Sequence, residues 1–94
     1  MYLISYDIEN NKIRNKIAKT LEDYGKRVQY SVFECHIDQE RFQTLYMKLA
    51  ELMEEEEKGN IRFYQICLAC EKKTVVMGVE NELLSTINDD TIII

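Results

Sequence analysis

An aspartate closes the first apolar segment of the chain. Apolar side chains occupy positions 2, 4, 6 and 8, and Asp7 stands among them just before amide-rich turn residues. Aspartate is depleted in strands, because its short acid competes for backbone hydrogen bonds and is costly to bury. A carboxylate is also the oxygen ligand that Mg²⁺ takes, together with waters and phosphate oxygens. Asp7 is therefore a candidate ligand for Mg²⁺ or another divalent cation; the alternative is a structural role as a cap of the next helix or turn.

Two-fold symmetry strengthens the case for a metal at Asp7. One carboxylate is a poor magnesium site, but two copies that meet at a dimer axis relieve their repulsion by sharing a proton or by recruiting a cation. A cation held in this way lowers the pKa of a bound water and stabilises charge on a scissile phosphate. If Asp7 lies near such an axis, the chemistry that the pair of acids could support is phosphodiester hydrolysis.

Basic residues follow Asp7 within a short stretch that contains few acids. The formal net charge of −5 argues against a nucleic-acid partner when taken alone, because phosphate binding depends on Lys and Arg. Charges at positions 12, 16 and 19 also fit the solvated face of an amphipathic helix. A solvated face and a basic patch on an acidic protein both remain open, and the cations concerned are Lys12, Arg14, Lys16, Lys19, Lys26 and Arg27.

The cysteines and the histidine give weaker signals. Cys67 and Cys70 have the spacing of a metal-binding pair, and Cys35 with His36 would have to complete a zinc site. A strand would place Cys67 and Cys70 on opposite faces, and nothing near His36 in the sequence would orient it as a general base. Three cysteines fit reduced thiols better than a disulfide framework.

The chain lacks the sequence signals of export and membrane insertion. No apolar run approaches the roughly 18 residues of a membrane span, and no signal peptide is recognisable. We expect a cytoplasmic protein without a membrane partner.

Hydrophobic periodicity indicates alternating strands and helices. A strand is predicted over residues 2–8, followed by a helix that Asn10 or Asn11 caps and that Gly25 ends. Asp38 is the expected cap of a second helix. The remaining strands are predicted over residues 27–37, 61–69 and 74–79, with a short final strand over 91–94.

This order favours a single α+β domain over residues 1–94 with a ferredoxin-like βαββαβ arrangement. Its antiparallel sheet would carry both helices on one face, with an extra short strand at the C-terminal end. The other face would then expose Phe33, Cys35 and similar side chains in a monomer. A second copy laid on that face would cover them, so a homodimer is expected.

Three stretches resemble a known family. "YLISYDI", "NNKIRNKIAKTLEDYG" and "RVQYSVFEC" are similar to the Cas2 family of small CRISPR-associated adaptation proteins, over residues 1 to about 37. The resemblance implies a ferredoxin-like homodimer that acquires spacers with the Cas1 integrase. It also implies metal-dependent nuclease activity, as in several members of the family.

The resemblance carries over residue by residue to a candidate site. It implies that Asp7 is the catalytic and metal-binding aspartate, and that "TIII" is the strand that members add to the partner's sheet. Lys16 stands where some members have arginine. A lysine cannot make the bidentate phosphate contact that an arginine makes. Phe33 and Tyr6 could stack on bases, although such rings more often belong to a core or a dimer contact. The implied nucleic-acid ligands are Tyr6, Arg14, Lys16, Arg27, Ser31 and Phe33.

Two classes of function remain open, and a third is weaker. The first is a homodimeric, magnesium-dependent endonuclease that cuts RNA or DNA. The second is a structural adaptor that bridges integrase subunits on DNA without cutting. The third is an unrelated ferredoxin-like regulatory module, or a toxin ribonuclease of the VapD type.

Overall fold

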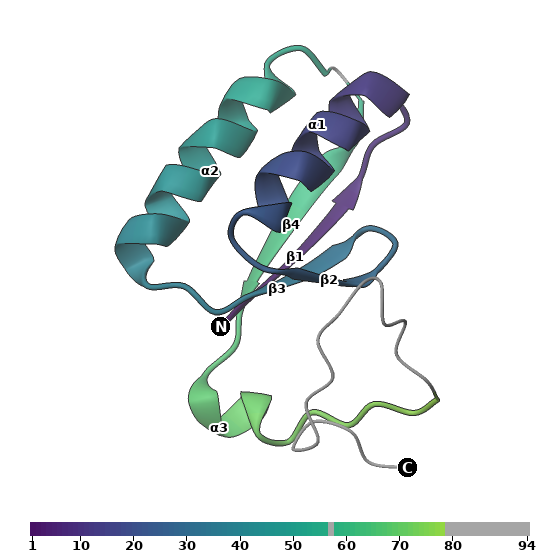
Figure 1. The fold of residues 1–94 in the computed structure, drawn as a ribbon. Coiled ribbons are helices and arrows are strands. Elements are labelled where there is room, and N and C mark those ends of the chain that lie inside the picture. Colours follow the sequence, from purple (N-terminus) through teal and green to yellow (C-terminus); the bar gives the residue numbers. More distant parts are fainter. Residues whose placement is uncertain (57, 79–94) are drawn as a thin grey trace.

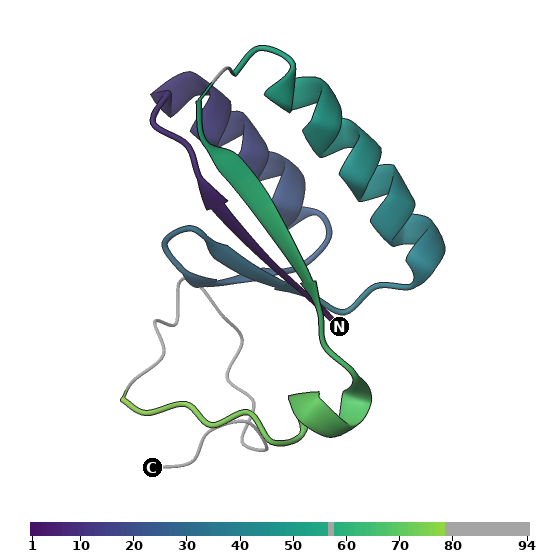
Figure 2. The same ribbon diagram turned by 180° about the vertical axis from the view of Figure 1, so that it is seen from behind.

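Two helices lie side by side on one face of an antiparallel sheet (Figures 1 and 2). The computed structural model describes residues 1–56 and 58–78. The four strands of the described sheet are ordered β2-β3-β1-β4, and each neighbouring pair is antiparallel. This arrangement confirms the predicted ferredoxin-like α+β fold. The described elements are β1 (Tyr2–Asp7), α1 (Asn11–Glu22), β2 (Lys26–Gln29), β3 (Val32–Cys35), α2 (Gln39–Met53), β4 (Asn60–Gln65) and α3 (Leu68–Glu71).

Both long helices begin at the caps that the sequence predicts. The Oδ1 of Asn10 accepts a hydrogen bond from the Ile13 N–H at 3.1 Å, and Asp38 caps α2 by accepting from the Arg41 N–H at 2.8 Å. The apolar stripe of α1 (Ile13, Ile17, Ala18 and Leu21) is buried, as are Leu45 and Leu49 of α2. None of the helices in the described part of the chain is long and apolar enough to cross a membrane.

The predicted strand over 27–37 is wrong, because this segment forms a hairpin. β2 and β3 are joined at Tyr30 and Ser31, and the pairing shifts register between Arg27 and Gln29. A tyrosine and a serine carry no glycine or asparagine signal for a tight turn, so propensity alone extends the strand through them. The hairpin supplies the second and third strands of the fold.

The segment after β4 also differs from prediction. β4 ends at Gln65, and Cys67 caps the short helix α3 instead of continuing the strand. The cause is local: the Cys67 Sγ accepts a hydrogen bond from the Cys70 N–H at 3.3 Å, which closes a turn. Of the strand predicted over 74–79, the described residues 74–78 contain only an isolated bridge at Val76. Residue 79 and the predicted strand over 91–94 lie outside the described residues.

The core lies between the sheet and the two long helices. Phe33 and Cys35 are fully buried in it, so the expectation that they are exposed is wrong. The physical reason is register, since Ile4 pairs with Phe33 and Tyr2 with Cys35, and residues that pair directly share a face. The opposite face, called the open face below, is covered by no helix that the structure describes. Its residues are Leu3, Ser5, Asp7, Lys26, Gln29, Val32, Glu34, Asn60, Arg62 and Tyr64.

Candidate metal and nucleic-acid site

Asp7 ends β1 with an exposed carboxylate on the open face. It pairs with Asn60, the first residue of β4. Among the described residues its side chain has no hydrogen-bond or ion-pair partner. Asn10, not Asp7, caps α1, because its side chain accepts a hydrogen bond from the first turn of that helix. The carboxylate oxygens are therefore available to an external ligand.

The backbone at Asp7 is held closely by β4. Gly59 has a φ of +98°, and a Cβ at this position would lie 2.3 Å from the Asp7 carbonyl oxygen. Only glycine accepts both this left-handed backbone and this close approach without strain. The position of Asp7 thus depends on the residue that enters the neighbouring strand.

Arg14 braces the loop that follows Asp7. Its Nη1 donates to the Ile8 carbonyl oxygen at 3.1 Å and to the Glu9 carbonyl oxygen at 3.5 Å. Its Nη2 donates to the Oδ1 of Asn11. The half-buried guanidinium therefore donates most of its hydrogen bonds to the β1–α1 loop and the start of α1. In this arrangement Arg14 positions the loop rather than presenting a free fork to a phosphate.

Tyr6, Arg27, Ser31 and Phe33 come together beneath the β2–β3 hairpin. The Tyr6 N–H donates to the Ser31 carbonyl oxygen at 3.1 Å, and Arg27 donates to the Tyr6 hydroxyl at 3.5 Å. The Arg27 guanidinium also lies 5.2 Å from the centre of the Phe33 ring. Tyr6 is only 3% exposed and Phe33 is 0% exposed, so neither ring is available to stack on a base in this structure. The cluster joins the hairpin to the end of β1 on the helix-covered face.

Lys16 lies apart from the other predicted ligands. It lines a groove between the two long helices with Thr20, Lys48 and Glu51. The helices cover one face of the sheet (Figure 1), whereas the strand pairing places Asp7 on the open face. The structure therefore does not bring Lys16 and Asp7 together within one subunit.

Sequence reasoning missed a cation on the same face as Asp7. Arg62 of β4 is paired with Ser5 of β1, one row along from the pair of Asp7 with Asn60. Diagonal neighbours of this kind lie about 7–8 Å apart, within reach of a long side chain. Arg62 is exposed, and its Nη1 donates to the Tyr64 hydroxyl at 3.5 Å. Only the strand register could have revealed it.

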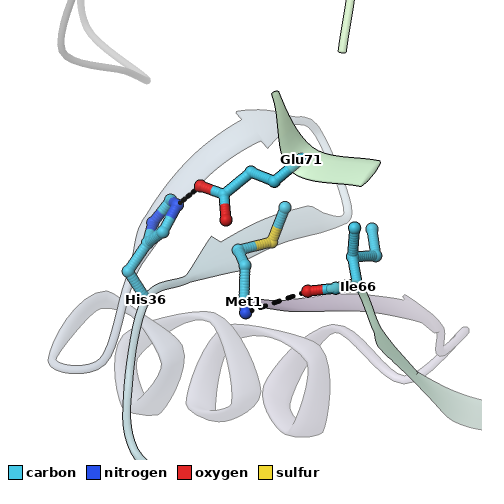
Figure 3. A network of polar contacts seen from close by, with 4 residues as sticks. All are labelled: Met1, His36, Ile66 and Glu71. Carbon is cyan, nitrogen blue, oxygen red and sulfur yellow. Dashed lines mark hydrogen bonds and ion pairs between the residues drawn. The ribbon is translucent and has the colours of Figure 1, made fainter. Parts of the chain in front are cut away.

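His36 contacts a carboxylate that lies far from it in the sequence. Its Nε2 contacts the Oε1 of Glu71 from α3, as Figure 3 shows. The expectation that His36 lacks an orienting partner holds only for nearby residues. This pair is remote from Asp7 in the sheet, because His36 follows β3 at the end where Tyr2 of β1 begins.

The described residues do not by themselves form a metal site around Asp7. Within residues 1–56 and 58–78, no group of three His, Cys, Asp or Glu side chains is placed to hold an ion. Asp7 is exposed and unpaired within those residues, which suits a hard cation that keeps several waters. A further carboxylate ligand would have to come from outside the described residues of this subunit, and another copy of the chain is one source.

Comparison with known proteins identifies the family. Residues 1–74 match the family model described as CRISPR associated protein Cas2. The chain is 44% identical over 77 residues to "CRISPR-associated endoribonuclease Cas2 1" of Chloroflexus aurantiacus, covering 82% of this chain and 83% of that protein.

Solved structures give the same result. Streptococcus pyogenes Cas2 at pH 6.5 superposes with a TM-score of 0.71 and 30% identity, covering 82% of this chain and 98% of that one. A chain of a "Partial Cas6-RT-Cas1--Cas2 complex" gives a TM-score of 0.69 and 37% identity, over 78% of this chain and 84% of that one. The chain described here belongs to the CRISPR-associated Cas2 family.

Proposed function

We propose that this protein is a homodimeric endonuclease of the Cas2 family that cuts RNA or DNA. In this proposal the two Asp7 carboxylates of the dimer hold the divalent cation that cleavage requires. The observation that carries the proposal is the exposed Asp7 carboxylate, which has no partner among the described residues and lies on the open face. Support comes from the relative in Chloroflexus aurantiacus, which is named an endoribonuclease.

The open face suits a second copy of the chain. Leu3 and Val32 are half-buried there, and Tyr64 is 46% exposed, next to the charged residues Glu34 and Arg62. A symmetric dimer uses the same patch on both subunits, so an acid of one copy can meet a base of the other. Such a dimer would cover the apolar side chains and bring the two copies of Asp7 toward one axis.

Asp7 and the residues around it would have separate roles in hydrolysis. A divalent cation, when bound, supplies a water of lowered pKa and charge stabilisation at the phosphate. Asp7 provides its anchoring oxygens, and Arg14 keeps the β1–α1 loop in place through the Ile8 carbonyl. Arg62 offers an exposed cation on the same face, suited to a flanking phosphate.

Paired acid-to-amide variants test the proposal. Asp7→Asn keeps the size of the side chain and removes the charge, and Glu9→Gln makes the same change at an exposed acid two residues later. Cleavage of single-stranded RNA and of duplex DNA is measured with Mg²⁺ and with a chelator, and the dimer is checked by light scattering. We expect Asp7→Asn and chelation to abolish cleavage while Glu9→Gln retains it. Equal cleavage by wild type and Asp7→Asn would refute the catalytic role.

A second function is favoured by one specific observation. The chain superposes on a component of a complex that also contains Cas1, so we propose that it forms such a complex and takes part in spacer acquisition. An adaptor role requires the dimer but not the Asp7 carboxylate. Integration of a DNA fragment by Asp7→Asn together with Cas1 would therefore separate the two functions, since cutting would be lost and integration kept.

A further inference from the structure

Cys67 and Cys70 form a pair of exposed thiols that the proposed nuclease does not use. Both are free, and both lie on the first turn of α3 and its cap. Residues three apart on a helical turn are neighbours, with Cβ atoms about 5–6 Å apart, so a small adjustment reaches the separation that a disulfide needs. The turn thus brings together two thiols that a strand would have separated.

One hydrogen bond makes the two thiols unequal. The Cys70 N–H donates to the Cys67 Sγ at 3.3 Å, and this bond lowers the pKa of the Cys67 thiol. The Cys70 pKa is raised, mainly by the side-chain hydrogen bond with Cys67. Because the thiolate is the nucleophile in disulfide exchange, Cys67 is the attacking group and Cys70 the resolving group.

The turn is fastened on both sides. Before it, the Met1 ammonium donates to the Ile66 carbonyl oxygen at 3.2 Å, and the Ile66 N–H donates to the Met1 carbonyl oxygen at 2.8 Å. After it, Glu71 contacts His36 (Figure 3). The pair of cysteines lies between these two anchors, so closing a bond across the turn costs less conformational entropy than in a free loop.

A metal site is less well supported than a disulfide at this position. Tetrahedral zinc needs four ligands, and the described residues contain no third His, Cys, Asp or Glu grouped with this pair. The nearest acid in sequence, Glu71, is engaged by His36.

We propose that Cys67 and Cys70 form a thiol–disulfide exchange site that reacts with low-molecular-weight disulfides and closes to an intramolecular disulfide. The Cys67 thiolate attacks one sulfur of the external disulfide, which forms a mixed disulfide and releases one thiolate. Cys70 then loses its proton and attacks the Cys67 sulfur, which releases the second thiolate. The two cysteines lose two electrons and two protons in total, and the external disulfide is reduced to two thiols.

The third cysteine is an internal control. Cys35 is 0% exposed, and burial raises the pKa of its thiol to about 11. Buried thiols of this kind are inert in the folded state. Reaction at Cys35 would therefore report unfolding rather than exchange.

Oxidised glutathione is the probe, and intact mass with peptide mapping is the readout. The full-length protein is incubated with it, quenched with acid and analysed over time. We expect wild type and Cys35→Ser to lose two hydrogen atoms in mass without keeping an adduct. Cys70→Ser should keep one glutathione on Cys67, and Cys67→Ser should react more slowly than Cys70→Ser. Circular dichroism confirms that each variant is folded, and Asp7→Asn should behave as wild type, so the outcome is independent of the proposed nuclease.

Three results would overturn the proposal. The first is wild-type protein that accumulates glutathione on both cysteines without closing. The second is equal reaction rates for Cys67→Ser and Cys70→Ser, which would show that the hydrogen bond does not select the attacking thiol. The third is stoichiometric zinc that purified wild type retains and Cys67→Ser loses, which would assign a metal site instead.

Discussion

Gly59 offers a sharp test of how the fold positions Asp7, because the chain contains a matched control. Gly59 and Gly78 have almost the same backbone, with φ of +98° and +100°. A Cβ at Gly59 would lie 2.3 Å from the Asp7 carbonyl oxygen, whereas a Cβ at Gly78 meets no atom of the described residues within 4 Å. Alanine at either position introduces the strain of a left-handed backbone, but only alanine at position 59 also clashes with the backbone of β1.

The two costs can be separated by magnitude. Left-handed strain is about 1–2 kcal/mol for a residue with a Cβ. Overlap with a well-packed backbone adds about 1–3 kcal/mol. Gly59→Ala should therefore lower the free energy of unfolding by about 2–5 kcal/mol, and Gly78→Ala by at most about 2 kcal/mol. An added cost of about 1 kcal/mol, the smallest expected, corresponds to a melting temperature roughly 4–8 °C lower for Gly59→Ala than for Gly78→Ala.

Urea unfolding followed by circular dichroism measures both variants at one protein concentration, because a dimer would make stability depend on concentration. The linear extrapolation gives the free energy in water. If Gly59→Ala and Gly78→Ala were equally stable, the close approach to Asp7 would carry no energy. β4 would then not fix the end of β1.

Three further predictions concern the cap of α1 and the buried core. Asn10→Ala removes the cap of α1 and should cost about 1 kcal/mol in urea unfolding, whereas an unchanged midpoint would mean that water replaces the cap. Phe33→Ala leaves a cavity at a fully buried position and should cost about 3–5 kcal/mol by the same measurement, and a cost below about 1 kcal/mol would place the ring at the surface. The raised pKa of Cys35, about 11, predicts that iodoacetamide labels this residue slowly at pH 9 in the folded protein and rapidly in urea. Because the folded pKa lies above the usual value of 9.0, this thiol's contribution to stability is fully present below pH 9 and is lost as pH rises toward 11; rapid labelling of folded protein at pH 9 would contradict its burial.

Local signals predicted the helices well. α1 could be predicted because its signals are close together in the sequence. They are the Asn10 cap and the apolar stripe of Ile13, Ile17 and Leu21. The hairpin at Tyr30 and Ser31 could not be predicted in the same way, because neither residue has a strong turn preference. Its formation depends on pairing with β1, which is a long-range contact.

Register decided what the sequence left open. The pairing of Ile4 with Phe33 buries Phe33, and the pairing of Ser5 with Arg62 places a cation on the face of Asp7. A shift of one residue would reverse both results, since strand side chains alternate between faces. The strand predicted over 61–69 extends too far for a local reason instead, because a hydrogen bond from the Cys70 N–H to the Cys67 Sγ closes a turn after β4.

The surroundings of Asp7 favour the proposed role as a metal ligand over a role as a structural acid. An acid that stabilises the fold is bound by the backbone or by a cation, as Asp38 is bound by the Arg41 N–H. Around Asp7 the contacts instead fix the backbone: Gly59 approaches its carbonyl oxygen, and Arg14 holds the loop that follows. The carboxylate itself has no partner among the described residues. Aspartate is disfavoured in strands, and no side-chain contact among those residues compensates for its presence here. A rigid backbone with a free carboxylate is the arrangement that a metal ligand requires, because the ion then meets preformed geometry.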